Sequence, residues 1–232
     1  MSELAVMNWS GGKDSMLALH YLLGDSRHKL YCLLTTVNES YRRIAMHGVR
    51  EELLQYQALA LGVPLKTVYL PESPDMVSYE AVIDKEFKQL KSEGVTVSVF
   101  GDIFLEDLKH YREDQFNKIG LATYFPLWKM PSRKVVEEFI DLGYKTIIVC
   151  AKEGLQDFCG RVIDRSFLDE LPADVDPCGE NGEFHTFVFD GPQFNVPVNF
   201  ELGELVFKEF PSPVSGEGLS GYWYVDLVPF IK

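Results

Sequence analysis

The chain has 232 residues, of which 46% are hydrophobic and 25% are charged, the balance of an ordinary globular protein. No apolar run approaches the roughly 18 residues that a membrane span requires, and the first residues lack the regions of a signal peptide, so we expect a cytoplasmic protein without membrane contact. The formal net charge of −13 counts against nucleic acid as a partner, because such binding depends on Lys and Arg at the phosphates. The four cysteines form no C-x-x-C pair, so we expect neither disulfides nor zinc.

Short apolar runs alternate with amphipathic segments over the first half of the chain. Strands are predicted at residues 4–8, 30–37, 65–70, 95–100 and 121–126. Helices are predicted between them, the first capped by Asp14 or Ser15 and the second ended by Gly62. Nearly continuous apolar strands joined by helices are typical of a parallel sheet that is covered on both faces.

The pattern changes after about residue 128. A further helix and an apolar strand at residues 146–150 come first, followed by a region rich in Pro, Gly and aromatic residues. Alternating stretches at residues 184–190 and 222–228 indicate additional strands. We therefore expect two domains, at residues 1–128 and 129–232, of which the second is smaller and of α+β type.

A glycine-rich hexapeptide, SGGKDS, occupies residues 10–15 directly after the first predicted strand. Its glycines let a ligand approach the main chain, and the following helix N-terminus presents unpaired N–H groups to an anion. Lys13 adds a cation for phosphate oxygens, whereas Asp14 would repel bare phosphate and suits a bridging Mg²⁺. The segment is not a Walker A loop, because Met7 stands where that pattern needs glycine and Asp14 follows the lysine. It predicts a phosphate-binding loop of another kind.

The hexapeptide resembles the PP-loop of the ATP pyrophosphatase (adenine nucleotide alpha-hydrolase-like) superfamily. Within it, the chain is most similar to the diphthine–ammonia ligase (diphthamide synthase)-like family. That resemblance also includes His47-Gly48, Phe100-Gly101-Asp102-Ile103, Tyr111-Arg112-Glu113, Pro126-Leu127-Trp128 and the stretch CGENGEFHT at residues 178–186. It implies a Rossmann-like, HUP-type domain whose five parallel strands lie in the order 3-2-1-4-5, with ATP and Mg²⁺ as substrate and cofactor.

The candidate site residues come from the motifs and from the resemblance. Those expected to contact the nucleotide are Ser10, Gly11, Gly12, Lys13, Asp14, Ser15, Thr36, Val37, His47, Gly101 and Arg112. Those expected to act in catalysis are Lys13, Asp102, Glu180, Glu183 and His185, and the expected Mg²⁺ ligands are Asp14 and Asp102. Gly101-Asp102 ends a predicted strand at the sheet edge where such folds bind ligands.

Each of these motifs also has a structural interpretation. Gly101-Asp102 is compatible with a simple turn, His47 with a surface or capping residue, and Arg112 with an exposed helix pair of little energetic weight. Asn181-Gly182 is a strong hairpin signal, so residues 178–186 could form a turn with solvated acids rather than an acceptor site. Cys178 is a weak candidate nucleophile, because nothing in the sequence clearly lowers the pKa of its thiol.

The resemblance favours an AMP-forming ligase, in which a substrate carboxylate attacks the α-phosphate of MgATP and ammonia or an amine then forms the amide. The expected partners are ATP, a carboxylate acceptor, which can be borne on a protein, and ammonia; a homodimer is possible. Diphthine on elongation factor 2 is the family's named acceptor, and it applies only in archaea and eukaryotes. Two alternatives are a PP-loop enzyme that modifies tRNA or nucleobases, which the acidic charge disfavours, and a non-catalytic ATP-binding module, which would not need Lys13 and Asp14.

Overall fold

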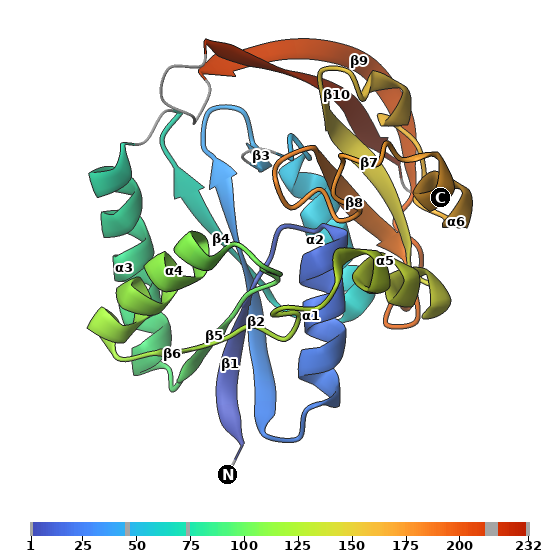
Figure 1. The fold of residues 1–232 in the computed structure, drawn as a ribbon. Coiled ribbons are helices and arrows are strands. Elements are labelled where there is room, and N and C mark those ends of the chain that lie inside the picture. Colours follow the sequence, from blue (N-terminus) through green and yellow to red (C-terminus); the bar gives the residue numbers. More distant parts are fainter. Residues whose placement is uncertain (1, 45–46, 73–74, 212–217, 231–232) are drawn as a thin grey trace.

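The computed structural model describes residues 2–44, 47–72, 75–211 and 218–230. Its first half is built on a parallel sheet (Figure 1). The parallel strands are β1 (Glu3–Asn8), β2 (His28–Asn38), β4 (Leu65–Leu70), β5 (Val97–Val99) and β6 (Ala122–Tyr124). They lie in the order β4-β2-β1-β5-β6, so the predicted Rossmann-like class and the predicted order 3-2-1-4-5 are confirmed.

One strand of this sheet was not predicted. β3 (Arg43–Ile44) pairs antiparallel with the last two residues of β2, beyond the point at which β1 has ended. A two-residue strand gives no usable periodicity in the sequence, because alternation needs several residues to be recognised.

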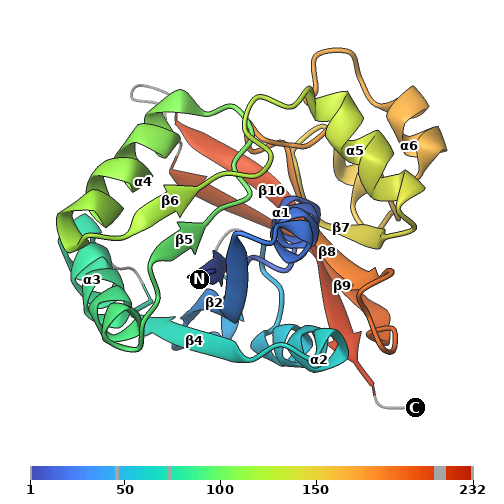
Figure 2. The ribbon, with the colours of Figure 1, turned by 90° about the horizontal axis from the view of Figure 1, so that it is seen from below.

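Two layers of helices cover the sheet (Figure 2). They are α1 (Lys13–Gly24) and α2 (Glu51–Leu61) on one face, with α3 (Met76–Ser92) and α4 (Glu106–Ile119) on the other. Neighbouring residues of β2 point to opposite faces, as a strand requires. Leu33 joins the apolar core under α1 and α2, and Leu34 joins the core under α3 and α4. None of the described helices is long and apolar enough to cross a membrane.

The start of α1 differs from the prediction that Asp14 or Ser15 caps it. The helix begins at Lys13, and Gly12 is the N-cap, with extended backbone and no side-chain cap. Asp14 and Ser15 instead lie in the first turn, where the Ser15 hydroxyl donates to the Gly12 carbonyl at 2.9 Å. Because glycine has no side chain that could accept a hydrogen bond, a backbone N–H group at this helix end bonds to an acceptor from another part of the chain.

The second half of the chain forms an antiparallel sheet in the order β8-β7-β10-β9. Its elements are α5 (Ser132–Asp141), β7 (Lys145–Lys152), the 3₁₀ helix η1 (Gln156–Phe158), α6 (Arg165–Glu170), β8 (Phe184–Asp190), β9 (Phe200–Pro211) and β10 (Leu219–Pro229). Leu17 of α1 and Phe187 of β8 belong to one continuous apolar core. The second sheet therefore packs on the α1 side of the first, which brings β8 to the glycine-rich loop.

Candidate active site

A cavity of about 500 Å³ lies at the carboxyl ends of the parallel strands, where folds of this type bind ligands. It is enclosed by the glycine-rich loop, by residues from α3 and α4, and by the segment that leads into β8. The predicted site residues that line it are Ser10, Gly12, Lys13, Asp14, Ser15, Thr36, His47, Gly101, Asp102, Arg112, Glu180 and His185. Gly11, Val37 and Glu183 are not among the lining residues.

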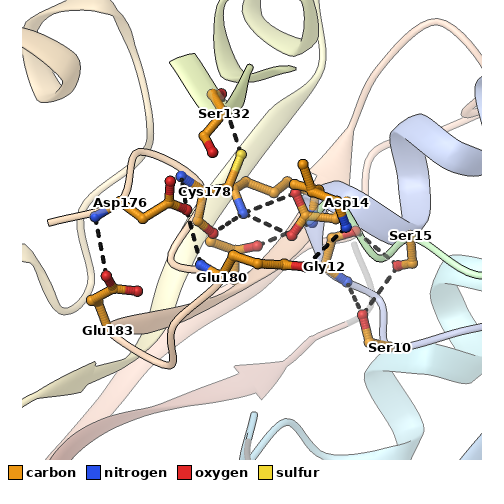
Figure 3. A network of polar contacts seen from close by, with 12 residues as sticks. Ser10, Gly12, Asp14, Ser15, Ser132, Asp176, Cys178, Glu180 and Glu183 are labelled. Atoms are coloured by element: carbon orange, nitrogen blue, oxygen red, sulfur yellow. Dashed lines mark hydrogen bonds and ion pairs between the residues drawn. The ribbon is translucent and has the colours of Figure 1, made fainter. Parts of the chain in front are cut away.

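The glycine-rich loop is tightly folded. Gly11 has a φ of 77°, a left-handed conformation that favours glycine. The Ser10 hydroxyl accepts the Gly12 N–H at 3.2 Å and lies 3.1 Å from the Ser15 hydroxyl (Figure 3). These contacts bring both serine hydroxyls together at the N-terminus of α1, where an anion is favoured.

Lys13 is buried at the centre of the site. Its ammonium donates to the Asp14 carboxylate at 2.8 and 3.0 Å and to the Cys178 carbonyl. Burial is the largest single effect and would lower the pKa of Lys13, but attraction to Asp14, its hydrogen bond to Asp14 and the effects of Cys178 and Glu180 together outweigh it. The net pKa is raised, so the side chain remains a cation. Burial also raises the pKa of Asp14, against the opposing effect of Lys13. A charged lysine is thus held between the loop and the segment before β8.

Glu180 faces the same region from the second half of the chain. Its carboxylate accepts the N–H of Ile103 at 2.9 Å, directly after the Gly101-Asp102 pair. Burial raises the pKa of Glu180 to about 7, the Ile103 hydrogen bond opposes this, and the nearby carboxylate of Asp14 adds to it. A carboxyl group with this pKa can exchange a proton near neutral pH, as a general acid or base must.

Asp102 and Arg112 form an ion pair on the wall of the cavity. The Nε of Arg112 lies 2.7 Å from one Asp102 carboxylate oxygen, and its terminal nitrogen donates to the other at 3.2 Å. The guanidinium also stacks on the Phe100 ring, 4.4 Å from the centroid. Gly101 packs against the first turn of α1, since a Cβ there would come within 2.9 Å of the Asp14 backbone. This close approach explains the glycine beside Asp102.

β8 supplies the missing partner for the N-terminus of α1. The Thr186 hydroxyl accepts the Lys13 N–H at 3.0 Å, and the Thr186 carbonyl lies 3.2 Å from Nδ1 of His47. His47 stacks on His185 with centroids 4.5 Å apart. Burial lowers the pKa of His47 to about 4 and lowers that of His185 well below its usual value, so both rings are neutral at pH 7. Nε2 of His185 is buried and has no hydrogen-bond partner in the described part of the protein.

Gln57 is a polar residue that the sequence analysis did not identify. It is fully buried on α2, where it accepts from the Trp9 indole at 2.8 Å and donates to the carbonyls of Gly11 at 3.0 Å and Val188 at 2.6 Å. The Gly11 carbonyl also accepts the Val188 N–H at 2.9 Å. A signal was present in the sequence, because Gln57 stands four residues after Leu53 on the apolar face of its helix.

The segment before β8 is not the hairpin that Asn181-Gly182 suggested. β8 pairs with β7, whose last residue precedes it by more than thirty positions, and the segment consists of successive tight turns at Gly179 and Gly182. Glu183 accepts a hydrogen bond from the backbone of Asp176 (Figure 3) and another from the backbone of Asn181, so its carboxylate holds the turns together. Glu183 was expected to act in catalysis, yet it points into this segment rather than into the cavity.

Cys178 is a buried thiol that donates to the Ser132 carbonyl at 3.3 Å. Burial raises the pKa of this thiol, and the nearby Lys13 only partly offsets the rise. Since the thiolate is the nucleophilic form, this residue is not suited to covalent catalysis.

Asp14 and Asp102, the two residues expected to bind Mg²⁺, both line the cavity. Each already faces a cation, Lys13 and Arg112 respectively. The described residues contain no group of three or more His, Cys, Asp or Glu side chains that could hold a metal ion. Magnesium commonly binds through one or two carboxylates together with substrate phosphates. The two carboxylates therefore fit a metal that arrives with the nucleotide.

The fold and the loop together define a class: a Rossmann-like α/β protein of the PP-loop superfamily. Residues 3–123 match the diphthamide synthase N-terminal domain, and residues 131–210 match the diphthamide synthase C-terminal domain. The chain belongs to the diphthamide synthase family.

Other comparisons are less informative. The structure resembles one described as a predicted subunit of tRNA methyltransferase from Methanocaldococcus jannaschii DSM, with 15% identity and a TM-score of 0.44. The likeness covers 62% of this chain and 77% of the other, and at this level it carries no argument about function. None of the curated proteins compared matches the sequence.

Proposed function

We propose that this protein is an ATP-dependent, AMP-forming ligase that adenylates a carboxylate and then joins the activated acyl group to ammonia or an amine. In the first step a carboxylate oxygen attacks the α-phosphate and pyrophosphate leaves. In the second step the amine attacks the acyl carbon, AMP leaves, and one proton is released. The observation that carries the proposal is that the phosphate loop and the acidic segment before β8 line one cavity.

The phosphate side of the cavity suits a leaving pyrophosphate. The N-terminus of α1, the Ser10 and Ser15 hydroxyls and the Lys13 ammonium all line it, and they provide the dipole, donors and cation that stabilise such a group. Asp14 and Asp102 are the carboxylates available to a Mg²⁺ bound to the phosphates. Thr36 and His47 line the side near the end of β2, where we place the adenosine.

Glu180 is the residue we assign to the acceptor step. Its pKa of about 7 allows it to take the proton that the attacking amine must lose. The neutral His185, with a buried and unpartnered Nε2, is available as a hydrogen-bonding group for the acceptor or the amine. We propose residues 129–232 as the acceptor domain and residues 1–128 as the nucleotide domain.

The test is product analysis with MgATP, ammonium and, as the acceptor, elongation factor 2 that carries diphthine. We expect AMP and pyrophosphate in amounts that depend on the acceptor. Lys13→Ala should reduce turnover by roughly 10²–10³-fold, the usual effect of removing a transition-state stabilising donor. Lys145→Ala, which removes a lysine whose side chain is 58% exposed, is the matched control and should leave turnover unchanged. Release of ADP, failure to bind ATP, or full activity of Lys13→Ala would contradict the proposal.

A further inference from the structure

The second sheet has two edges that differ in how they are covered. At the β8 edge, the Val188 N–H donates to the Gly11 carbonyl and the Val188 carbonyl accepts from Gln57. At the opposite edge, β9 pairs with β10 on one side, and no described segment of the chain pairs with it on the other. An unprotected edge strand offers a row of backbone donors and acceptors to another strand.

β9 is also unusually apolar for an open edge. All of its twelve residues except the first are exposed. Large apolar side chains stand on both of its faces: Leu202 (56% exposed), Leu205 (48%), Val206 (40%), Phe207 (38%) and Phe210 (43%). Phe207 lies on the side of Trp223 and Phe210 on the side of Tyr222 and Tyr224. Long, exposed, hydrophobic edges are sites of strand pairing between chains.

We propose that β9 pairs antiparallel with β9 of a second copy of this chain, with the two-fold axis at Val206. This register places Glu204 of each copy opposite Lys208 of the other, and Leu205 opposite Phe207. Within the described chain, neither Glu204 nor Lys208 forms an ion pair, and Lys208 only faces the Tyr224 ring at 5.9 Å. Both charges are therefore left for a partner, and the two-fold register supplies each with its opposite.

Neighbouring registers lack this complementarity. Residues that face each other must point to the same side of the sheet, so the axis can move only by whole residues. An axis at Leu205 sets Glu204 against Val206, and an axis at Phe207 sets Glu204 against Phe210, so neither register gives Glu204 an opposite charge. A bulge near Asp226, opposite residues 203–204, ends the regular part of the strand, so the paired core is residues 204–208. Because the same patch meets itself, the assembly closes as a dimer.

The test is the molar mass of the full chain in solution as a function of concentration, measured by light scattering or sedimentation. The wild type should form a dimer. Glu204→Lys and Lys208→Glu should each raise the dimer dissociation constant by roughly tenfold or more, because each puts like charges together at both symmetric positions. The double variant Glu204→Lys/Lys208→Glu restores both pairs and should dimerise like the wild type.

Glu209→Lys is the matched control, since it makes the same charge change on β9 at a position that faces Gly203 in this register. It should leave the dissociation constant near the wild-type value, and the melting temperature of the monomer should be similar in all variants because these side chains are exposed. A wild type that stays monomeric at every concentration, a double variant that does not recover, or an equal effect of Glu209→Lys would each overturn the proposal.

Discussion

The backbone N–H of Lys13 donates to the hydroxyl of Thr186 at 3.0 Å, across 173 positions of the chain. This bond joins the first turn of α1 to β8, and hence the glycine-rich loop to the second sheet. It also occupies one of the amide groups that a helix N-terminus would otherwise offer to an anion. The shape of the phosphate loop therefore depends on the position of the second sheet.

Gly12→Ala tests this dependence. Gly12 has extended backbone, so alanine is not strained there, but its Cβ would lie 3.1 Å from the Thr186 carbonyl and 3.2 Å from His47. We expect ATP affinity to fall roughly tenfold, the equivalent of about 1.4 kcal/mol, as the Lys13–Thr186 bond is pushed apart. Isothermal titration calorimetry with MgATP measures this affinity.

The control for that variant is Gly24→Ala, at the other end of the same helix. A Cβ at Gly24 meets nothing within 4 Å, so the change should leave ATP affinity intact and stabilise the protein by up to ~1 kcal/mol. An equal loss of affinity in both variants would mean that the contact with Thr186 does not shape the loop.

Gln57→Leu should impair nucleotide binding from a distance. The substitution leaves the carbonyls of Gly11 and Val188 and the Trp9 indole without their buried partner, at a cost of about 1–3 kcal/mol for each unsatisfied group. We expect a lower melting temperature and a raised KM for ATP, measured with kcat at a temperature where the variant is fully folded. The exposed Gln55, two residues earlier on α2, gives the matched control Gln55→Leu. A lower melting temperature with an unchanged KM would restrict Gln57 to a structural role.

Glu180 makes stability depend on pH. The folded-state pKa of Glu180, about 7, lies above the ordinary value of 4.5. The contribution of this carboxyl group to the free energy of unfolding is therefore complete below pH 4.5 and is lost as the pH rises through 7. Glu180→Gln keeps an acceptor for the Ile103 N–H but cannot ionise. We expect the variant to gain stability relative to wild type between pH 5 and pH 8, as followed by thermal unfolding. A constant difference over that range would contradict a raised pKa.

The same carboxyl group predicts a change in the rate profile. If Glu180 takes the proton from the amine, the acceptor step should increase with pH around 7 in the wild type and lose that dependence in Glu180→Gln. Single-turnover measurements of amide formation test this, because they separate the acceptor step from ATP binding.

His47 should make the protein sensitive to acid. Burial lowers the pKa of His47 to about 4, below its ordinary value of 6.5, so stability is lost as the pH falls from about 6.5 towards 4. His47→Gln should reduce the fall in melting temperature between pH 7 and pH 5. His110→Gln, at an exposed position on α4, should leave that fall unchanged.

The fold followed closely from the sequence because each parallel strand is a short apolar run between helical segments. The order of those strands came from the resemblance of the loop rather than from periodicity. The cap of α1 was predicted wrongly, since local preference favoured Asp14 or Ser15, whereas the actual partner of the helix end is Thr186 on a distant strand. No local rule could supply that contact.

The candidate site was likewise predicted only as far as local sequence patterns allow. Short motifs located Lys13 and Glu180, but the direction of a side chain depends on the surrounding turns, and Glu183 points into its own segment instead of the cavity. Gln57 was missed because a single polar residue on an apolar helix face says nothing about which carbonyls it will meet. Long-range hydrogen bonds of this kind become visible only once the two sheets are packed together.

We propose that attack of a carboxylate splits ATP between its α- and β-phosphates. The most direct measurement is exchange of labelled pyrophosphate into ATP, with diphthine-bearing elongation factor 2 present and ammonium absent, because a reversible adenylation needs no amine. We predict label in ATP that depends on the acceptor and is lost in Lys13→Ala but kept in Glu180→Gln. Absence of exchange together with formation of ADP would contradict the account.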